Sequence, residues 1–443
     1  MRQLIKNVHI LTIDEEMTEI SHGFVLIEGE IIQAIGKMTE KLPVADVIID
    51  GKQGILIPGM INTHTHVGMI PFRSLGDDVP DRLRRFLFPL EKVMTKELAQ
   101  ASAQYAVAEM LLSGVTSFCD MYYFEDAIAE VVAQMGARAI LGETIIDMPT
   151  CDFSTPKAAL AWCESFIEKW HNHSLITPAI APHATNTNTP EDLAQIVALA
   201  KRYAIPITMH VAEMSYEMEA FAQRYQQTPI AFLNDLGYFE QHFIMAHAIF
   251  TESSDLELLQ SKAQSVKVAH CIGANTKSAK GVAPVKEMLA HQWQVGLGTD
   301  GPSSGNTLDL FTQMRMFANF HKTYEHDRGL FPAKEIVALA TKGGAKVLGL
   351  DHLVGTIEIG KKADITLIET NSVNMFPIFD AYSALVYSAN ASNVSDVWVN
   401  GHQLVANKQL VAQSVTTLRE NLALSVSTFN TKSSAVNGRQ VTL

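Results

Sequence analysis

The stretch "PGMINTHTH" (residues 58–66) places His64 and His66 at the end of an apolar run that follows a Pro-Gly turn. In a β-strand, residues i and i+2 face the same side, so we expect both imidazoles to point inward with Thr65 turned away. Such a pair predicts either a metal site or two polar residues at the end of a buried strand. The ends of the chain's other apolar runs decide between these readings.

Short apolar runs alternate with amphipathic stretches through the middle of the chain. The stretches 95–114 and 190–204 have helical spacing, and Pro190 suits a first helical turn. Strand-like runs alternating with helices favour a parallel (β/α)8 TIM barrel in the α/β class. The alternative is an open doubly wound sheet, but the Gly-x-Gly-x-x-Gly loop of its dinucleotide-binding members is missing after the first run. The runs cover residues 55–64, 115–122, 137–145, 176–183, 205–213, 242–249, 265–271 and 294–301.

Both ends of the chain have the texture of short strands separated by polar or glycine-containing turns. We expect residues 1–55 and 353–425 to meet in one small β-sandwich domain. Residues 56–352 would then form the barrel between them. The polar residues 426–443 are predicted to be a loose tail.

The composition excludes several classes of protein. The chain has 443 residues, 47% of them hydrophobic, which is enough for a large core. A net charge of −13 and the absence of a long apolar run predict no nucleic-acid partner, no membrane partner and no membrane span. Four cysteines without a Cys-x-x-Cys pair, and an N-terminus that becomes acidic too soon for a signal peptide, predict a cytoplasmic protein. A homo-oligomer is left open.

Side chains that can bind metals stand at the ends of most of the runs. All carboxyl ends of the strands in such a barrel open on one face, so these side chains are expected to converge. Any one of the histidines could simply cap a buried strand. Packed together without a partner, however, they would lose several kcal/mol of hydration, so a cluster requires a cation. The residues are His64, His66, His183, His210, His247, His270 and Asp300.

Four of these residues form a nitrogen-rich ligand set. His64, His66, His210 and Asp300 together suit zinc or ferrous iron. A metal with an open position would lower the pKa of a bound water towards neutrality and so supply hydroxide.

Two further residues suit proton transfer near this predicted metal site. Glu213, three residues beyond His210, is expected to fold back over the site as a general acid and base, although it could also be a solvated loop residue. His247 could orient or polarise the water. Asp300 could accept a proton from it as well as bind the metal.

Four motifs resemble those of the amidohydrolase superfamily, in its mononuclear cytosine-deaminase-like and chlorohydrolase-like group. They are "PGMINTHTH", "HVAE" (210–213), "MAHAIF" (245–250) and "VGLGTDGPSS" (295–304). The segment 355–369 is similar to that family's return into its β-sandwich, so the resemblance covers nearly the whole chain. It implies the four metal ligands above, Glu213 as proton shuttle and His247 as the water-orienting residue. The run "IAPHATN" (180–186) lacks the lysine of binuclear relatives, which implies one ion, zinc or iron.

Within this group the chain most resembles the 5′-methylthioadenosine/S-adenosylhomocysteine deaminases. The resemblance rests on "FPLE" (88–91), "APHA" (181–184) and the segment 280–289. It implies that Glu91 binds ribose hydroxyls and that His183 binds a ring nitrogen of the base. We also expect His270 and Ser303 to contact the substrate. Without the resemblance, Glu91 would be taken for a solvated helix residue.

Two segments depart from the pattern of those deaminases. Glu143, in "RAILGETI" (138–145), stands where they carry an arginine for an amino-acid carboxylate, and the next loop (146–154) lacks a second arginine. A glutamate does not bind a carboxylate without a third partner, so substrates of the homocysteine type are disfavoured. The segment 270–281 also departs from the usual His-Asn-Pro pattern but keeps His270 and Asn275.

The predicted function is the hydrolytic deamination of an amino-substituted nitrogen heterocycle, a purine or purine nucleoside, with release of ammonia. The alternative is another heteroaromatic hydrolase, such as a triazine chlorohydrolase or a guanine or pterin deaminase. A non-enzymatic, metal-free member of the superfamily is disfavoured, because no ligand is missing. Residues 323–332 could form a lid, an interface or a loop.

Overall fold

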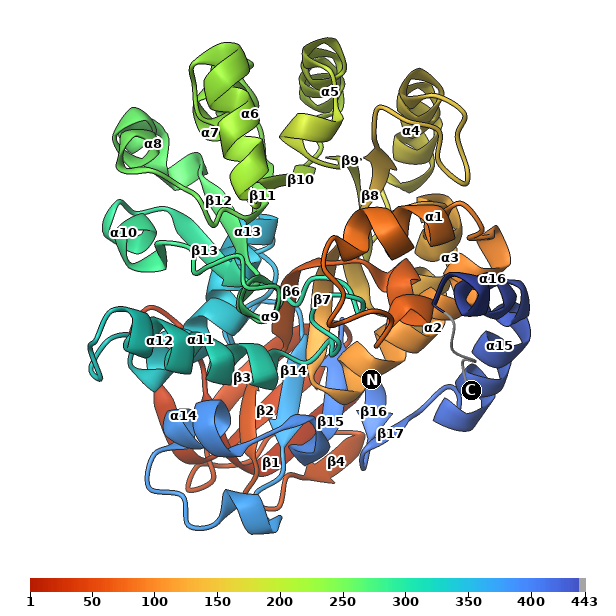
Figure 1. The fold of residues 1–443 in the computed structure, drawn as a ribbon. Coiled ribbons are helices and arrows are strands. Elements are labelled where there is room, and N and C mark those ends of the chain that lie inside the picture. Colours follow the sequence, from red (N-terminus) through yellow and green to blue (C-terminus); the bar gives the residue numbers. More distant parts are fainter. Residues whose placement is uncertain (438–443) are drawn as a thin grey trace.

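The computed structural model describes residues 1–437, and its central feature is a parallel barrel of eight strands. The strands lie in sequence order, and each neighbouring pair is parallel (Figure 1). Between the first and the last strand of the barrel, the side-chain oxygen of Asn62 accepts the main-chain N–H of Thr299 (3.0 Å), and its side-chain nitrogen donates to the hydroxyl of Thr299 (2.8 Å). The predicted α/β barrel is confirmed. Its strands are β6 (Met60–Thr65), β7 (Val115–Tyr122), β8 (Arg138–Ile145), β9 (Ile176–Pro182), β10 (Ile207–Val211), β11 (Phe243–His247), β12 (Lys267–His270) and β13 (Gln294–Leu297).

Helices surround the barrel and connect its strands (Figure 1). The two predicted helices form where expected, and Thr95 and Thr189 cap their first turns by accepting main-chain N–H groups. The helices are α2 (Lys96–Leu112), α3 (Glu125–Met135), α4 (Pro156–Trp170), α5 (Pro190–Tyr203), α6 (Ser215–Tyr225), α7 (Pro229–Asp235), α8 (Ser253–Leu258), α9 (Ile272–Lys277), α10 (Val285–Ala290), α11 (Leu310–Tyr324), α12 (Ala333–Ala338) and α13 (Gly344–Leu348).

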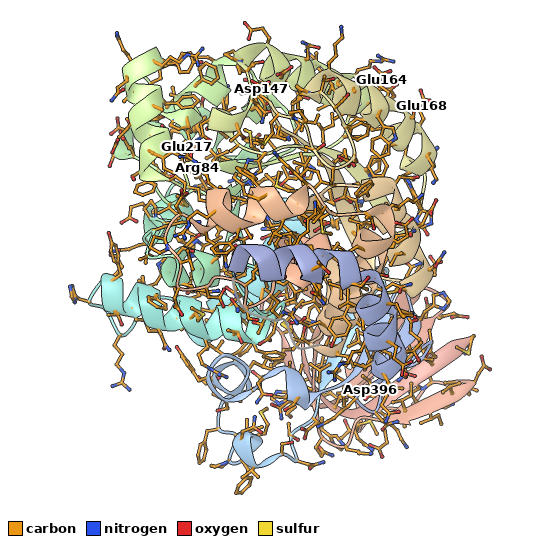
Figure 2. The ribbon with its side chains drawn as sticks, turned by 45° about the vertical axis from the view of Figure 1, so that its right-hand side comes forward. Arg84, Asp147, Glu164, Glu168, Glu217 and Asp396 are labelled. Atoms are coloured by element: carbon orange, nitrogen blue, oxygen red, sulfur yellow. The ribbon has the colours of Figure 1, made fainter. Side chains whose placement is uncertain are left out.

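The described part of the chain ends in two helices, α15 (Val415–Ser425) and α16 (Ser427–Asn437). Helix α15 lies in the range expected for the β-sandwich, and α16 lies where a loose tail was expected. Helix α16 packs on the short helices η2 (Leu83–Leu87) and α1 (Phe88–Glu91), and it crosses the front of the molecule in Figure 2. Phe429 is buried, and its ring meets that of Phe72 edge-on, with centroids 4.8 Å apart. Sparse apolar residues in a polar segment therefore anchor a helix. Residues 438–443 of the expected tail lie outside the described residues.

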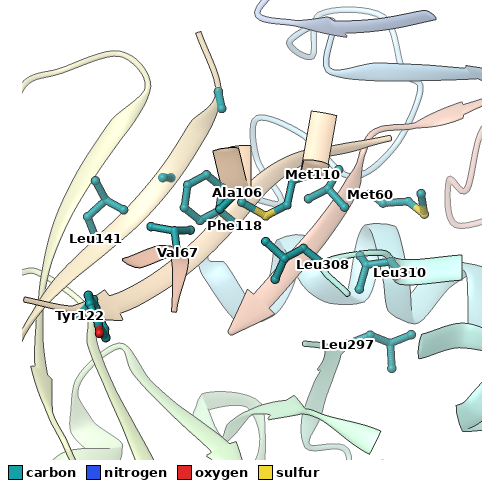
Figure 3. Close-up of a cluster of buried hydrophobic side chains, with 14 of the residues drawn as sticks. Met60, Val67, Ala106, Met110, Phe118, Tyr122, Leu141, Leu297, Leu308 and Leu310 are labelled. Carbon is teal, nitrogen blue, oxygen red and sulfur yellow. The ribbon is translucent and has the colours of Figure 1, made fainter. Parts of the chain in front are cut away.

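The outer face of the barrel carries the main hydrophobic core. Figure 3 shows Phe118 and Leu141 of the barrel in one cluster with Ala106 and Met110 of α2. Gly59, just before β6, is required by close packing, since a Cβ at this position would lie 2.1 Å from the hydroxyl of Thr116. The Pro-Gly turn thus lets the first strand approach its neighbour.

A bulge in β6 decides which way its histidines face. Ile61 lies in the interior cluster with Cys119 of β7. Strict alternation from Ile61 would turn His64 outward. Asn62 pairs with Phe118 and Thr65 pairs with Asp120, however, so β6 has one more residue than β7 between these two pairs. The extra residue brings the even-numbered side chains after Asn62 to the inner face.

Strands from both chain ends form a second, mixed sheet beside the barrel, as predicted. Strand β5 pairs with β1 from the N-terminal part and with β14 from the C-terminal part. Buried side chains such as Ile5, Leu56, Ile365 and Trp398 gather in one core cluster on this sheet. Its strands are β1 (Arg2–Leu11), β2 (Glu19–Glu28), β3 (Ile31–Lys37), β4 (Val47–Asp50), β5 (Ile55–Pro58), β14 (Ile365–Ile368), β15 (Val394–Val399), β16 (His402–Ala406) and β17 (Gln409–Leu410).

The segment 323–332, left open by the sequence, connects α11 to α12. Lys322 donates to the carbonyl of Arg328 (2.8 Å), and the ring of Phe331 packs 4.9 Å from that of Phe317. The segment is thus a loop folded against the end of α11. No described helix is long and apolar enough to span a bilayer.

A buried ion pair joins the barrel to the second sheet. Nε and Nη2 of Arg138, at the start of β8, donate to the two carboxylate oxygens of Asp364 (2.9 and 3.1 Å), beside the start of β14. Both side chains are at most 3% exposed. The main-chain N–H of Asn400 donates to the same carboxylate (2.7 Å).

We expect Arg138→Met to lower the free energy of unfolding by about 3–5 kcal/mol, because it leaves the Asp364 carboxylate buried without its cation. The matched control is Arg202→Met, whose ion pair with Glu164 is exposed and should matter much less. Urea unfolding of the three proteins at equal metal content measures the difference. A loss in Arg138→Met no larger than in the control would contradict the expectation.

Candidate metal-dependent active site

Three imidazole nitrogens and a carboxylate oxygen meet at the carboxyl ends of the barrel strands, which we call the mouth. Nε2 of His210 lies 3.2 Å from Nε2 of His64 and 3.3 Å from Nε2 of His66. Oδ1 of Asp300 lies 3.2 Å from Nε2 of His66 and 4.0 Å from Nε2 of His64. Ligand atoms about 2.1 Å from a tetrahedral ion stand roughly 3.4 Å apart. The donor set therefore has the chemistry and spacing to hold a divalent metal ion.

Main-chain carbonyls fix the nitrogen that two of these imidazoles present. Nδ1 of His66 donates to the carbonyl of Met121, and Nδ1 of His210 donates to the carbonyl of His183, both at 2.6 Å. A carbonyl only accepts, so each Nδ1 carries hydrogen, and each ring presents the lone pair of Nε2 to the cluster whenever Nε2 carries no proton. Lone pairs that point at one another repel, and a cation between them removes this repulsion.

The electrostatics of the cluster favour a cation as well. Burial lowers the pKa of His64 and His210 well below the usual range, and nearby histidines lower both further. Burial acts on His66 too, but Asp300 outweighs it and raises the pKa of His66 to about 9. A proton and a metal ion therefore compete for the space between His66 and Asp300.

Two residues of the mouth have unusual backbone conformations. His247, at the end of β11, has a φ of 71°, and Asp300, after β13, has a φ of 58°. Residues other than glycine rarely adopt this left-handed region. The main-chain N–H of Asp300 donates to the carbonyl of His64 (3.1 Å), which holds the strained turn beside the ligands.

Glu213 lies just beyond β10, next to His247. Oε1 of Glu213 is 3.6 Å from Nε2 of His247 and contacts Nζ of Lys280. Burial alone would raise the pKa of Glu213, but the charges of His247 and Lys280 outweigh it and hold the pKa well below its usual range. Glu213 is therefore held in its ionised form at the mouth.

The comparison with known proteins agrees with this architecture. The chain matches the model of the amidohydrolase family over residues 55–404. It belongs to the amidohydrolase family. This membership confirms the predicted family and the broader prediction of a hydrolase that acts on carbon–nitrogen bonds.

Two similar relatives of this amidohydrolase carry the same activity in their names. It is 36% identical over 413 residues to 5-methylthioadenosine/S-adenosylhomocysteine deaminase 1 of Syntrophus aciditrophicus, covering 92% of this chain and 93% of the relative. It is 37% identical over 412 residues to the 5-methylthioadenosine/S-adenosylhomocysteine deaminase of Carboxydothermus hydrogenoformans, with coverage of 92% and 93%.

Solved structures with the same fold include two zinc-containing proteins. An adenosine deaminase from Xanthomonas campestris with bound zinc matches with a TM-score of 0.93 and 28% identity, over 97% of this chain and 98% of the other. An atrazine chlorohydrolase from Arthrobacter aurescens in complex with zinc matches with a TM-score of 0.86 and 24% identity, over 96% and 100%. The second likeness shows the shared fold alone.

Two of the residues that the sequence suggested for substrate binding lie beside the ligand cluster of this amidohydrolase. The ring of His183 is 5.0 Å from that of His210 and 6.1 Å from that of Phe88, on the same short helix as Glu91. Nδ1 of His183 bonds the hydroxyl of Thr187 (3.0 Å), so Nε2 is left to face a ligand. Burial lowers the pKa of His183 to about 4, which keeps the ring neutral.

Glu91 lines a small pocket together with Phe88, Tyr123 and the loop 148–151. Burial raises the pKa of Glu91 to about 7, although the charge of His66 and a hydrogen bond with Tyr123 act in the opposite direction. Glu91 is thus a half-buried titratable group of the pocket wall.

Ser303 and His270 take different positions. Ser303 is buried at the mouth, where its hydroxyl lies 3.5 Å from Sδ of Met69 and its carbonyl accepts from Arg82. The structure does not bring His270 into the ligand cluster. Its Nε2 lies 3.1 Å from Nε2 of His321 on α11, because its side chain faces the outer helices, like Val268 two residues earlier.

Glu143 is fully buried, and its Oε2 accepts the main-chain N–H of Glu125 (3.1 Å) at the start of α3. Burial raises the pKa of Glu143 well above its usual range, and the charge of Asp152 raises it further. Asp152 follows directly on the loop that lines the pocket. The wall near this loop therefore offers acidic groups where a carboxylate-binding arginine would be needed.

Three supporting residues of the mouth were not assigned roles from the sequence. Asn275 accepts from Nδ1 of His247 through its side-chain oxygen (2.8 Å). Glu217, labelled in Figure 2, accepts the main-chain N–H groups of Ala212 and Glu213 (3.0 and 2.9 Å) and so fixes the turn that carries Glu213. Lys280 is the third. A glutamate in the first turn of a helix was the only signal for Glu217, and nothing in the spacing marked Lys280.

We expect the purified protein to contain one divalent metal ion per chain, and Asp300→Asn to lose most of it, because the substitution removes the one carboxylate of the four-residue donor set described above. His270→Gln, at the end of a neighbouring strand but facing α11, should keep the metal. Metal analysis after dialysis measures the three contents. In the native protein, a chelator should lower the melting temperature, since a ligand at about 100 times its dissociation constant adds about 2.7 kcal/mol of stability. Full metal content in Asp300→Asn would contradict the assignment.

Proposed function

We propose that this amidohydrolase removes the amino group from a purine nucleoside by hydrolysis and releases ammonia. The observation that carries the proposal is the position of Glu213 and His247 beside a donor set suited to one metal ion. The names of the relatives in the deaminase group support the choice of a 5′-methylthioadenosine- or adenosine-type substrate.

We propose His64, His66, His210 and Asp300 as the metal ligands and zinc as the ion. The similar adenosine deaminase from Xanthomonas campestris, which has bound zinc, supports this choice. When bound, the ion would supply a Lewis acid that lowers the pKa of a water molecule and makes it a nucleophile near neutral pH.

The chain's own residues would then move the protons. Water adds to the ring carbon that bears the amino group, and Glu213 passes a proton from the water to the adjacent ring nitrogen. His247 orients the water, since Asn275 fixes its ring by the hydrogen bond to Nδ1. Asp300 accepts the second proton of the water. The carbon–nitrogen bond breaks as the amino group takes up this proton, so that one water yields a ring carbonyl and one ammonia.

The substrate would be held on the side of the mouth that carries His183 and Glu91. Nε2 of His183 would bond a nitrogen of the base, and Glu91 would accept from the hydroxyls of the ribose. Ser303 is a further proposed contact. The acidic groups near the loop 148–151 favour an uncharged 5′ substituent over an amino-acid carboxylate.

We expect Glu213→Gln to lower kcat by about 10²–10⁴-fold, because the amide cannot carry a proton. The metal content should persist, since Glu213 is not among the proposed ligands. Ammonia release from adenosine, methylthioadenosine, guanine, pterin and aminotriazine compounds, with chloride release from chlorotriazines in parallel, measures the activity. Chloride release without ammonia release would overturn the deaminase proposal in favour of a chlorohydrolase.

We expect substrate binding to weaken as the pH falls through about 7, where Glu91 takes up a proton and loses its charge. A carboxylate above this pH accepts strong, charge-assisted hydrogen bonds. Glu91→Gln should therefore bind a nucleoside product roughly 10-fold more weakly at pH 8. It should also show no further weakening at pH 6. Calorimetric titration at both pH values measures this, and an unchanged pH dependence in Glu91→Gln would show that another group is responsible.

A further inference from the structure

Lys280 lies on the loop between α9 and α10 and reaches into the mouth. Its ammonium contacts Oε1 of Glu213, and the two side chains are only 20% and 17% exposed. Within the described residues, no other lysine or arginine forms an ion pair with Glu213. The neighbouring Lys277 points elsewhere, because its ammonium bonds Asp77 (2.8 Å) and contacts Asn306.

One buried residue positions both groups that approach Oε1 of Glu213. The main-chain carbonyl of Asn275 accepts the N–H of Lys280 (3.0 Å), and its side-chain oxygen accepts from Nδ1 of His247 (2.8 Å). Asn275 is fully buried. The loop then turns at Ala279 and Gly281, whose φ angles are 52° and 131°. Asn275 therefore positions both the main chain of Lys280 and the imidazole of His247.

This arrangement makes the two oxygens of Glu213 unequal. Oε1 faces Nε2 of His247 at 3.6 Å and contacts Nζ of Lys280. Oε2 has no recorded hydrogen bond among residues 1–437. A carboxylate that can rotate spends part of its time with neither oxygen directed at the substrate, whereas an ion pair on one oxygen fixes the orientation of the other.

We propose that Lys280 is a positioning residue that clamps Oε1 of Glu213, so that Oε2 is the oxygen that carries the proton between water and substrate. This inference rests on the proposed role of Glu213 in deamination. Lys280 itself takes up and gives off no proton in the reaction. The clamp also places a positive charge beside the two carboxylates of the mouth, Glu213 and Asp300.

The test compares Lys280→Met, Lys280→Arg and the control Lys286→Met in the metal-loaded enzyme. Lys286 lies on the same segment, but its side chain is 51% exposed and pairs with Glu325 on the surface. We expect Lys280→Met to lower kcat by about 10²-fold, the size of effect that follows a misplacement of about 1 Å in a catalytic group. KM, metal content and product affinity should stay near the wild-type values. Lys280→Arg should recover most of the loss, and Lys286→Met should behave as wild type.

Three results would overturn the clamp. They are a wild-type kcat in Lys280→Met, an arginine variant no better than the methionine variant, and a loss of kcat matched by an equal loss of metal or product binding. The last result would show a merely structural role.

A crystal structure of Lys280→Met gives a readout that does not depend on activity. The clamp predicts that the carboxylate of Glu213 rotates away from its wild-type orientation in that structure, and an unmoved carboxylate would count against it. If the wild-type enzyme releases no ammonia from any nucleoside, the proposed function fails. The orientation of Glu213 still tests the clamp in that case.

Discussion

The mouth of the barrel depends on one electrostatic constraint: lone pairs on neighbouring imidazoles are pointed at one another. Nδ1 of His66 and Nδ1 of His210 each donate to a main-chain carbonyl beside an adjacent strand, and Nε2 of each ring therefore faces inward. Asp300 adds a negative charge on the same point. The barrel brings these groups together, and the free energy of this arrangement is favourable only with a cation or a proton among them.

Other features of the mouth follow from this constraint. The strained backbone at His247 and Asp300 places two side chains that a regular strand end would direct elsewhere. Glu217 accepts the main-chain N–H of Glu213, and Lys280 pairs with the carboxylate of Glu213, whose side chain is only 17% exposed. Rigid support on both sides is what a proton carrier needs if it is to act without rearrangement.

Much of the fold was predictable because its signals are local. Alternating apolar runs and amphipathic stretches gave the barrel, and the Pro-Gly turn located its first strand. The direction in which the histidine side chains face was harder to predict. His64 and His66 do face inward, but they do so because of the bulge after Asn62, and a one-residue shift in register leaves no mark in the sequence. His270 ends a strand in the same way and faces outward, because the pleat of its strand places it on the side of Val268.

The parts that the sequence did not predict depend on distant partners. The proposed role of Lys280 depends on its ion pair with Glu213, which lies far away in the sequence. Glu143 is buried beside the start of α3, where it accepts the main-chain N–H of Glu125. The polar residues 427–437 form a helix because a few apolar side chains pack on a surface made by residues far away in the chain. Propensity alone does not report such tertiary contacts.

The packing of α16 also bears on the order of assembly. All the proposed metal ligands are synthesised before α13, which packs on β6 and β13, and before α16. The short helices that carry Phe88 and Glu91 gain their outer support only when Phe429 arrives. The wall that carries Phe88 and Glu91 therefore depends on a segment that is synthesised after all the proposed metal ligands.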